Sequence, residues 1–197
     1  RGDDYWDVLP SLSLSLRFDS DFVIRFGAAR EIQRPRLDDM RVNIAYGANI
    51  AEGIVTGSGG NPSLRPYRAT AFDLTFEKYW GRSGYVALQL FHKTLHNYIY
   101  TAERPFDYSS YPLIQPTPPV DTMGRISQPF NGDGGKIYGA ELAGTIPFET
   151  FTSALTGFGV TGGVSYTKSE LRPDPSQPPE NIPGYSDWVA NGTAYFE

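Results

Sequence analysis

Two neighbouring stretches, SLSLSLRF at positions 11–18 and DFVIRFGAAR at positions 21–30, decide the fold class of this chain. In both, large apolar residues alternate with polar or small ones. A period of two places successive side chains on opposite faces of a β-strand. Because only three residues, 19–21, separate the two runs, the sequence predicts an antiparallel hairpin with one apolar face.

The same alternation returns further along the chain and predicts about seven strands in total. Within the run that begins at Tyr85, the apolar positions change phase after Leu90, which predicts a β-bulge near His92. The further segments are TAFDLTFEKYW (70–80), a run over about 85–101, KIYGAELAGTIPF (136–148), 158–167 and WVANGTAYFE (188–197).

The connections between these strands alternate between short and long. Short turns are expected at 19–21, 81–84 and 149–153, and long irregular stretches at about 32–68, 102–134 and 169–185. Outer-membrane barrels join up-and-down strands by short periplasmic turns and longer extracellular loops. Aromatic residues beside the short turns are also typical of an interface girdle: Phe18, Phe22, Trp80, Tyr85, Phe148 and Phe151.

Composition agrees with an all-β chain and excludes several other classes. The 197 residues include 21 Gly, 16 Pro, 12 Phe, 13 Tyr and 3 Trp, a mixture that disfavours helices. A net charge of −5 without a basic run argues against a nucleic-acid partner. The absence of cysteine excludes disulfides and thiolate chemistry. The longest charge-free stretch, 150–167, is too rich in Gly, Ser and Thr for a membrane helix.

One face of the predicted strands is polar and is expected to line a wet or plugged lumen. We expect Glu77 and Glu141 to pair there with Arg25 or Arg17. The predicted polar face comprises Ser13, Arg17, Arg25, Asp73, Glu77, Gln89, Glu141, Thr161, Asn191 and Glu197.

Several motifs then resemble the C-terminal half of the barrel of TonB-dependent outer-membrane receptors, of the Xanthomonas and Caulobacter type. They occur in the family's order over most of the chain: YWDVLPSLS from Tyr5, Arg34-Pro35 after a strand, GNPSLRPYRATAFDLTFEKYW from Gly60, VALQLFHKTLHNYI from Val86, GGKIYGAELAG from Gly134 and IPGYSDWVANGTAYFE from Ile182.

This resemblance implies a 22-stranded, plugged barrel, of which seven strands supply about a third. Residues 1–197 would then form part of one TonB-dependent receptor β-barrel domain in the bacterial outer membrane, with the plug domain and TonB box absent from this chain. The resemblance further implies energy-coupled transport of a scarce nutrient, with the TonB energy-coupling protein, outer-membrane lipid and an oligosaccharide or siderophore ligand as partners.

Ligand capture is expected in the long loops, where we select Arg34, Tyr46, Asn61, Tyr108, Asn131 and Asp133 as candidates. Aromatic faces with scattered Asn, Arg and Asp suit sugar stacking and hydroxyl hydrogen bonds, so an oligosaccharide is favoured over a ferric siderophore. The loop aromatics, among them Tyr185, can equally pack against one another.

Two signals for other chemistry are weak. Gly157, Gly159 and Gly162 spell the dinucleotide fingerprint, but no helix is expected after them. His92 and His96 would be too far apart on a strand to share a metal ion. We therefore expect no enzyme activity, no catalytic residues, no cofactor and no metal. The alternative of another class is a secreted β-sandwich carbohydrate-binding module.

Overall fold

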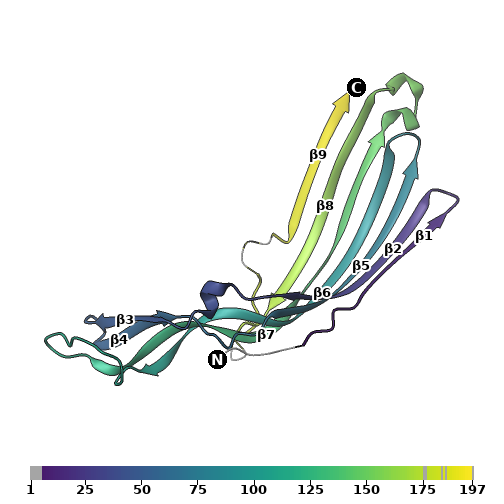
Figure 1. Ribbon diagram of the computed structural model, residues 1–197. Coiled ribbons are helices and arrows are strands. Elements are labelled where there is room, and N and C mark those ends of the chain that lie inside the picture. The colour runs from purple at the N-terminus through teal and green to yellow at the C-terminus, as the bar shows by residue number, and fades with distance from the viewer. Residues whose placement is uncertain (1–5, 175–176, 183, 185, 197) are drawn as a thin grey trace.

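The computed structural model describes residues 6–174, 177–182, 184 and 186–196; Tyr5, Pro183, Tyr185 and Glu197, named above, lie outside them. Over these residues, nine strands form one sheet. Seven follow one another as antiparallel neighbours in a curved layer, called here the wall (Figure 1). The wall strands are β1 (Ser11–Phe18), β2 (Phe22–Gln33), β5 (Tyr67–Trp80), β6 (Gly84–Asp107), β7 (Asp121–Pro147), β8 (Phe158–Leu171) and β9 (Trp188–Phe196).

The wall confirms the all-β, up-and-down prediction, and among the described residues it does not close. Strand β1 pairs only with β2, and β9 only with β8, so both outer edges are open. No helix among the residues described is long and apolar enough to cross a membrane.

The wall has two faces that differ in chemistry and can be read from residue parity. Residues paired across neighbouring strands are both odd or both even, as in Ser15 with Arg25 and Arg25 with Thr75. Even-numbered positions form the outer face, which carries exposed apolar side chains such as Leu12, Leu14, Leu16, Phe72, Leu88, Leu142 and Val164. Leu16 is 60% exposed, which suits contact with lipid tails rather than water.

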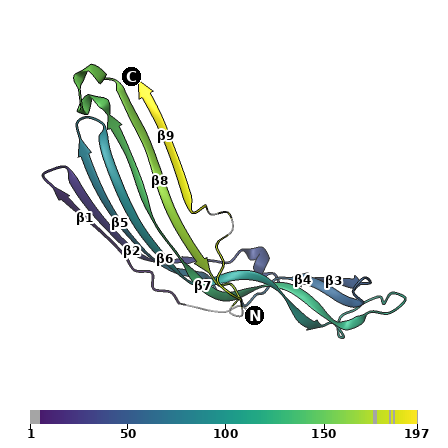
Figure 2. The same cartoon turned by 180° about the vertical axis from the view of Figure 1, so that it is seen from behind.

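The short turns all lie at one end of the wall, and the long connections at the other (Figures 1 and 2). The link from β7 to β8 carries the 3-10 helices η2 (Phe148–Thr150) and η3 (Ser153–Leu155). Aromatic rings gather at this end. The predicted pair Phe18 and Phe22 lies 5.9 Å apart between ring centroids, and Phe158 and Phe196, which were not predicted, lie 4.5 Å apart.

Beyond the end of the wall with the long loops, the last part of β6 and the first part of β7 continue as a projecting arm (Figures 1 and 2). The β6–β7 pairing extends to Asp107 and Met123. Two short strands complete the arm: β4 (Ile54–Gly59) lies parallel to β7, and β3 (Ile44–Asn49) lies antiparallel to β4. The 3-10 helix η1 (Leu37–Met40) precedes them.

The arm corrects the expectation that 32–68 and 102–134 are irregular throughout. Residues of β3 and β4 are rich in Gly, Ala and Ser, so they lack the large alternating side chains that signal a strand. Their pairing with a distant segment compensates for this low propensity. The remaining connection between β6 and β7 covers only 108–120.

The predicted β-bulge near His92 is wrong. The register between β6 and β7 runs without a shift from Tyr85 opposite Thr145 to Leu95 opposite Gly135. The apolar positions change phase because the strand leaves the apolar zone after Leu90. Beyond it, apolar side chains turn to the inner face, and Ile99 is 8% exposed.

Candidate functional site

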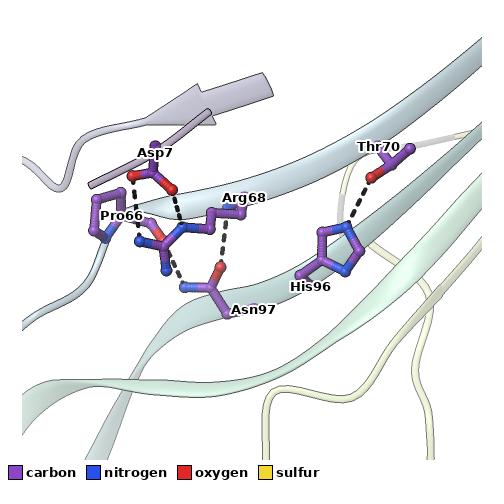
Figure 3. Close-up of polar contacts among 6 residues, drawn as sticks. All are labelled: Asp7, Pro66, Arg68, Thr70, His96 and Asn97. Atoms are coloured by element: carbon purple, nitrogen blue, oxygen red, sulfur yellow. Dashed lines mark hydrogen bonds and ion pairs between the residues drawn. The ribbon is translucent and has the colours of Figure 1, made fainter. Parts of the chain in front are cut away.

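The wall and the arm meet where β5 and β6 stop pairing, and Asn97 holds this junction. The last paired residues are Ala69 and Leu95. Beyond them, the Asn97 Oδ1 accepts a hydrogen bond from the Arg68 backbone N–H at 2.9 Å, and its Nδ2 donates to the Pro66 carbonyl at 2.8 Å (Figure 3). One side-chain amide thus takes the place of the backbone hydrogen bonds between the strands, so β5 can begin here while β6 continues into the arm.

The chain segment before β1 is attached to the same junction. The Arg68 guanidinium donates to both carboxylate oxygens of Asp7, at 2.6 and 3.2 Å (Figure 3). This hydrogen bonding lowers the pKa of Asp7 below its ordinary value. Next to it, the Thr70 hydroxyl lies 2.8 Å from the His96 Nε2. The junction therefore fixes three chain segments relative to one another.

Beside the junction, on the inner face of the wall, lies a concavity of about 750 Å³ that we call the mouth. Most of its wall residues, among them Glu31, Ala69 and Lys93, are odd-numbered and belong to the inner face, whereas Ile32 and Tyr98 are even-numbered. The Lys93 ammonium pairs with Glu31 at 2.7 Å. The other polar and aromatic lining residues are Arg34, Arg36, Asp39, Tyr67 and Tyr98.

The mouth combines two guanidinium groups with two phenol rings. The rings of Tyr67 and Tyr98 meet edge to face with centroids 5.8 Å apart. Guanidinium groups bind carboxylate, phosphate and hydroxyl oxygens, and phenol rings offer stacking faces. This arrangement suits the binding of a polar ligand and provides no nucleophile paired with a base.

Further toward the short turns, the inner face is polar, as predicted. Arg25 pairs with Glu77 at 2.7 Å, which confirms one of the expected carboxylate–arginine pairs. The Gln89 Nε2 donates to the Asp73 Oδ1 at 3.4 Å, and Glu141 lies opposite Gln89 in the register. These groups face the volume that a barrel lumen would occupy.

The candidate tyrosines lie in the core of the arm. This core consists of the buried residues Val55, Tyr108, Val120 and Ile126. Tyr46 packs against it, with its ring 5.6 Å from that of Tyr108. The Tyr108 hydroxyl donates to the Arg125 carbonyl at 3.0 Å, and burial raises the pKa of this phenol.

The loop aromatics thus pack against one another, which is the alternative that the sequence left open. The rings of Tyr46, Phe106, Tyr108 and Tyr111 lie between 4.8 and 5.7 Å from their neighbours. In addition, the Arg104 guanidinium lies over the ring of Phe130.

The four other candidates are divided between the mouth and the arm base. Arg34 lines the mouth. The Asn61 Nδ2 donates to the Pro129 carbonyl at 3.1 Å, and the side chain of Asn131 bonds both backbone groups of Arg65. Asp133 is exposed opposite Asn97. The structure therefore does not gather the six candidates into one site.

Sequence reasoning did not select Arg36, Tyr98 or Asn97. Arg36 shares the short Arg34-Pro35-Arg36 motif with a selected residue, and that spacing is a usable signal. Asn97 lies within a strand, and a side-chain amide there can bond backbone groups in place of a neighbouring strand. Tyr98 carries no local signal, because its partner Tyr67 is distant in the chain.

The motifs judged weak have structural explanations. Gly157 has a positive φ of 90° in a turn, and Gly159 and Gly162 lie in β8, so no phosphate-binding helix follows. His92 stacks on Tyr138 with ring centroids 6.2 Å apart. Within the described part of the chain, no group of three or more His, Asp or Glu is placed to hold a metal ion.

A single curved sheet with an apolar outer face, a polar inner face, short turns at one end and long loops at the other defines the wall of a transmembrane β-barrel. The model of the family described as "TonB dependent receptor-like, beta-barrel" matches residues 1–197. The chain belongs to this family, a family of outer-membrane transport receptors and not of enzymes.

Solved structures of similar fold agree with this placement. The siderophore receptor PirA from Pseudomonas aeruginosa superimposes with a TM-score of 0.65 at 17% identity, covering 95% of this chain and 30% of that one. The ferric enterobactin receptor PfeA, from the same organism, gives 0.67 at 18% identity, covering 95% and 25%. PirA from Acinetobacter baumannii gives 0.60 at 14% identity, covering 96% and 26%.

This chain therefore spans between a quarter and a third of the length of these receptors. At such identities the likeness concerns the fold alone. Among curated proteins, none matches the chain in sequence.

Proposed function

We propose that residues 1–197 form part of one barrel domain of an outer-membrane receptor that takes up a scarce nutrient by energy-coupled active transport. The observation that carries this proposal is the mouth, which lies on the inner face of the wall at the end with the long loops. A ligand bound there is held at the end of the lumen that the long loops surround. A plug domain, supplied by sequence outside 1–197, would connect the receptor to the TonB energy-coupling protein.

The first ligand class to test is an oligosaccharide, with a ferric siderophore as the second. Packing of the loop aromatics in the arm core removes Tyr46 and Tyr108 as stacking faces, so the carbohydrate argument now depends on Tyr67 and Tyr98. Their rings can stack on a sugar, and the guanidinium groups of Arg34 and Arg36 beside them can donate hydrogen bonds to its hydroxyl groups. The two guanidinium groups also suit an anionic ferric chelate, which supports the second class.

The receptor itself performs no covalent chemistry in this proposal. The inner face carries paired charges such as Arg25 with Glu77, whose role is to keep the lumen hydrated. The secreted β-sandwich is not favoured, because the described residues form one sheet whose apolar face has no second layer over it.

The test is an uptake assay on the intact receptor, with plant oligosaccharides and ferric siderophores, in cells with and without TonB. We expect saturable uptake of one class that depends on TonB and that falls roughly tenfold in Arg34→Ala, through loss of a charged hydrogen bond. Arg82→Ala, in the turn at the opposite end, is the matched control and should retain wild-type uptake.

Uptake of both classes without TonB would indicate a passive pore and reject the transport proposal. Uptake of siderophores alone would reject the oligosaccharide preference and leave energy-coupled transport supported.

A further inference from the structure

A group of cations lies on the outer face of the wall, just beyond its apolar zone at the end with the long loops. Lys136 on β7 and Lys168 on β8 occupy even-numbered positions, as do His92 on β6 and Arg172 after β8. The register places His92 opposite Tyr138 and Tyr138 opposite Lys168. The next positions along place Lys136 opposite Glu170. We call Lys136, Lys168 and Arg172 the basic cluster.

The apolar zone next to the basic cluster spans most of the apolar thickness of an outer membrane. On β8, the outward positions from Phe158 to Tyr166 carry no charge. Eight residue steps correspond to about 27 Å along the strand. At a tilt of about 40° this length spans roughly 20 Å across the membrane, which is most of the about 25 Å apolar band of outer-membrane barrels.

The upper limit of this zone is marked by an aromatic pair. Tyr166 and Trp188 lie with ring centroids 4.8 Å apart, and such rings favour the membrane–water interface. Lys168 is the next outward residue on β8 after Tyr166. The basic cluster therefore lies at the level of lipid headgroups.

The cluster also borders a concavity that faces lipid, not the lumen. A hollow of about 430 Å³ is lined at even-numbered positions by His92, Thr94, Gly134, Lys136, Glu170 and Arg172, and also by Gly135, Leu171 and Pro179. Its single carboxylate, Glu170, pairs with Lys136 at 3.0 Å. Among the described residues, Lys168 and Arg172 form no ion pair, so the cluster keeps a surplus of two positive charges.

We propose that the basic cluster binds the phosphate groups of a phosphorylated glycolipid headgroup in the outer leaflet, with the acyl chains against the apolar outer face below. The occupant follows from charge and position together: the cations attract phosphate, and the adjoining surface of exposed leucines and valines accepts hydrocarbon. A free anion would use only the first of these features. This assignment depends on the proposed orientation of the barrel, with the long loops outside the cell.

The test measures retention of diphosphoryl lipid A by the intact receptor in detergent micelles, by native mass spectrometry. Each Lys or Arg near a charged lipid surface contributes about 1 kcal/mol, so Lys136→Gln/Lys168→Gln should bind about 30-fold more weakly. Lys136→Arg/Lys168→Arg keeps both charges and should bind as the wild type does.

A second control separates position from charge. Lys78→Gln removes one cation from the outer face at the opposite end of the wall and should leave retention unchanged. Dephosphorylated lipid A should bind weakly to every variant. Because no transported ligand is present, lipid retention and nutrient uptake can fail independently.

Two results would overturn the proposal. One is equal retention of diphosphoryl lipid A by the wild type and the double Gln variant. The other is full displacement of the lipid by millimolar inorganic phosphate, which would assign the cluster to a free anion.

Discussion

The side chain of Asn131 closes two hydrogen bonds on the backbone of Arg65. Its Oδ1 accepts from the Arg65 N–H at 2.8 Å, and its Nδ2 donates to the Arg65 carbonyl at 2.9 Å. This pair fastens the chain between β4 and β5 to the base of the arm. A residue selected as a ligand contact thus has a structural role, and its variants report on loop stability.

Asn131→Ala removes both hydrogen bonds. We expect this change to destabilise the attachment of residues 60–66 to the arm by about 1–2 kcal/mol. Hydrogen–deuterium exchange of that segment in the intact receptor measures the change. Asn131→Asp keeps the acceptor and loses the donor, so exchange should rise by less. Unchanged exchange in Asn131→Ala would show that the two hydrogen bonds from Asn131 to Arg65 do not hold this segment in place.

Tyr108 separates packing from hydrogen bonding within the arm core. Tyr108→Phe loses only the bond to the Arg125 carbonyl and should cost about 1 kcal/mol. Tyr108→Ala also empties a fully buried site and should cost about 3–5 kcal/mol. The readout is amide exchange of β4, because this strand contributes Val55 to the arm core. Equal effects of the two variants would contradict the packing argument.

Gly124 tests the close approach of β4 to β7. A Cβ at this position would run into the carbonyl oxygen of Val55, whereas a Cβ at Gly47 would meet nothing within 4 Å. We therefore expect Gly124→Ala to destabilise the arm by about 1–3 kcal/mol or more, by overpacking. Gly47→Ala is the matched control and should be tolerated. Limited proteolysis of the arm distinguishes the two variants.

The Asp7–Arg68 pair predicts a pH dependence for the segment that precedes β1. Because the pKa of Asp7 in the folded protein lies below its ordinary value, its stabilising effect is complete above that ordinary value. The effect is lost as the pH falls through the lower, folded value. Exchange of residues 6–10, corrected for the intrinsic pH dependence of amide exchange, should therefore rise in acid.

Asp7→Asn provides the control for this pH dependence, because an amide does not titrate. Its exchange, corrected in the same way for the intrinsic rate, should already be raised at neutral pH and should change little on acidification. The same acid response in wild type and Asp7→Asn would assign the effect to another group.

The wall could be predicted from the sequence because its signal is local. Leu12, Leu14 and Leu16 alternate within one strand, and lipid and lumen impose the same period of two on every wall strand. The phase change after Leu90 predicts a backbone bulge, but in the structure it reflects the change from lipid-facing to loop-facing surroundings.

The arm was not predictable in this way because its contacts are distant in the chain. Thr56 pairs with Arg125, and neither neighbourhood shows a strong strand pattern. The same distance explains the candidate site. A tyrosine such as Tyr108 has the same sequence signature in a ligand pocket and in a small core, and only the position of Val55 and Ile126 decides between them.

The shared parity of paired residues gives the wall a reading frame of two. One residue inserted into the membrane zone of β5, between Phe72 and Trp80, would exchange the lipid and lumen positions on one side of the insertion. An insertion of any length at 117–119, in the exposed part of the connection between β6 and β7, would leave every wall strand in frame. Variation in this protein should therefore enter freely through the loop at the tip of the arm, while strand lengths change only in steps of two.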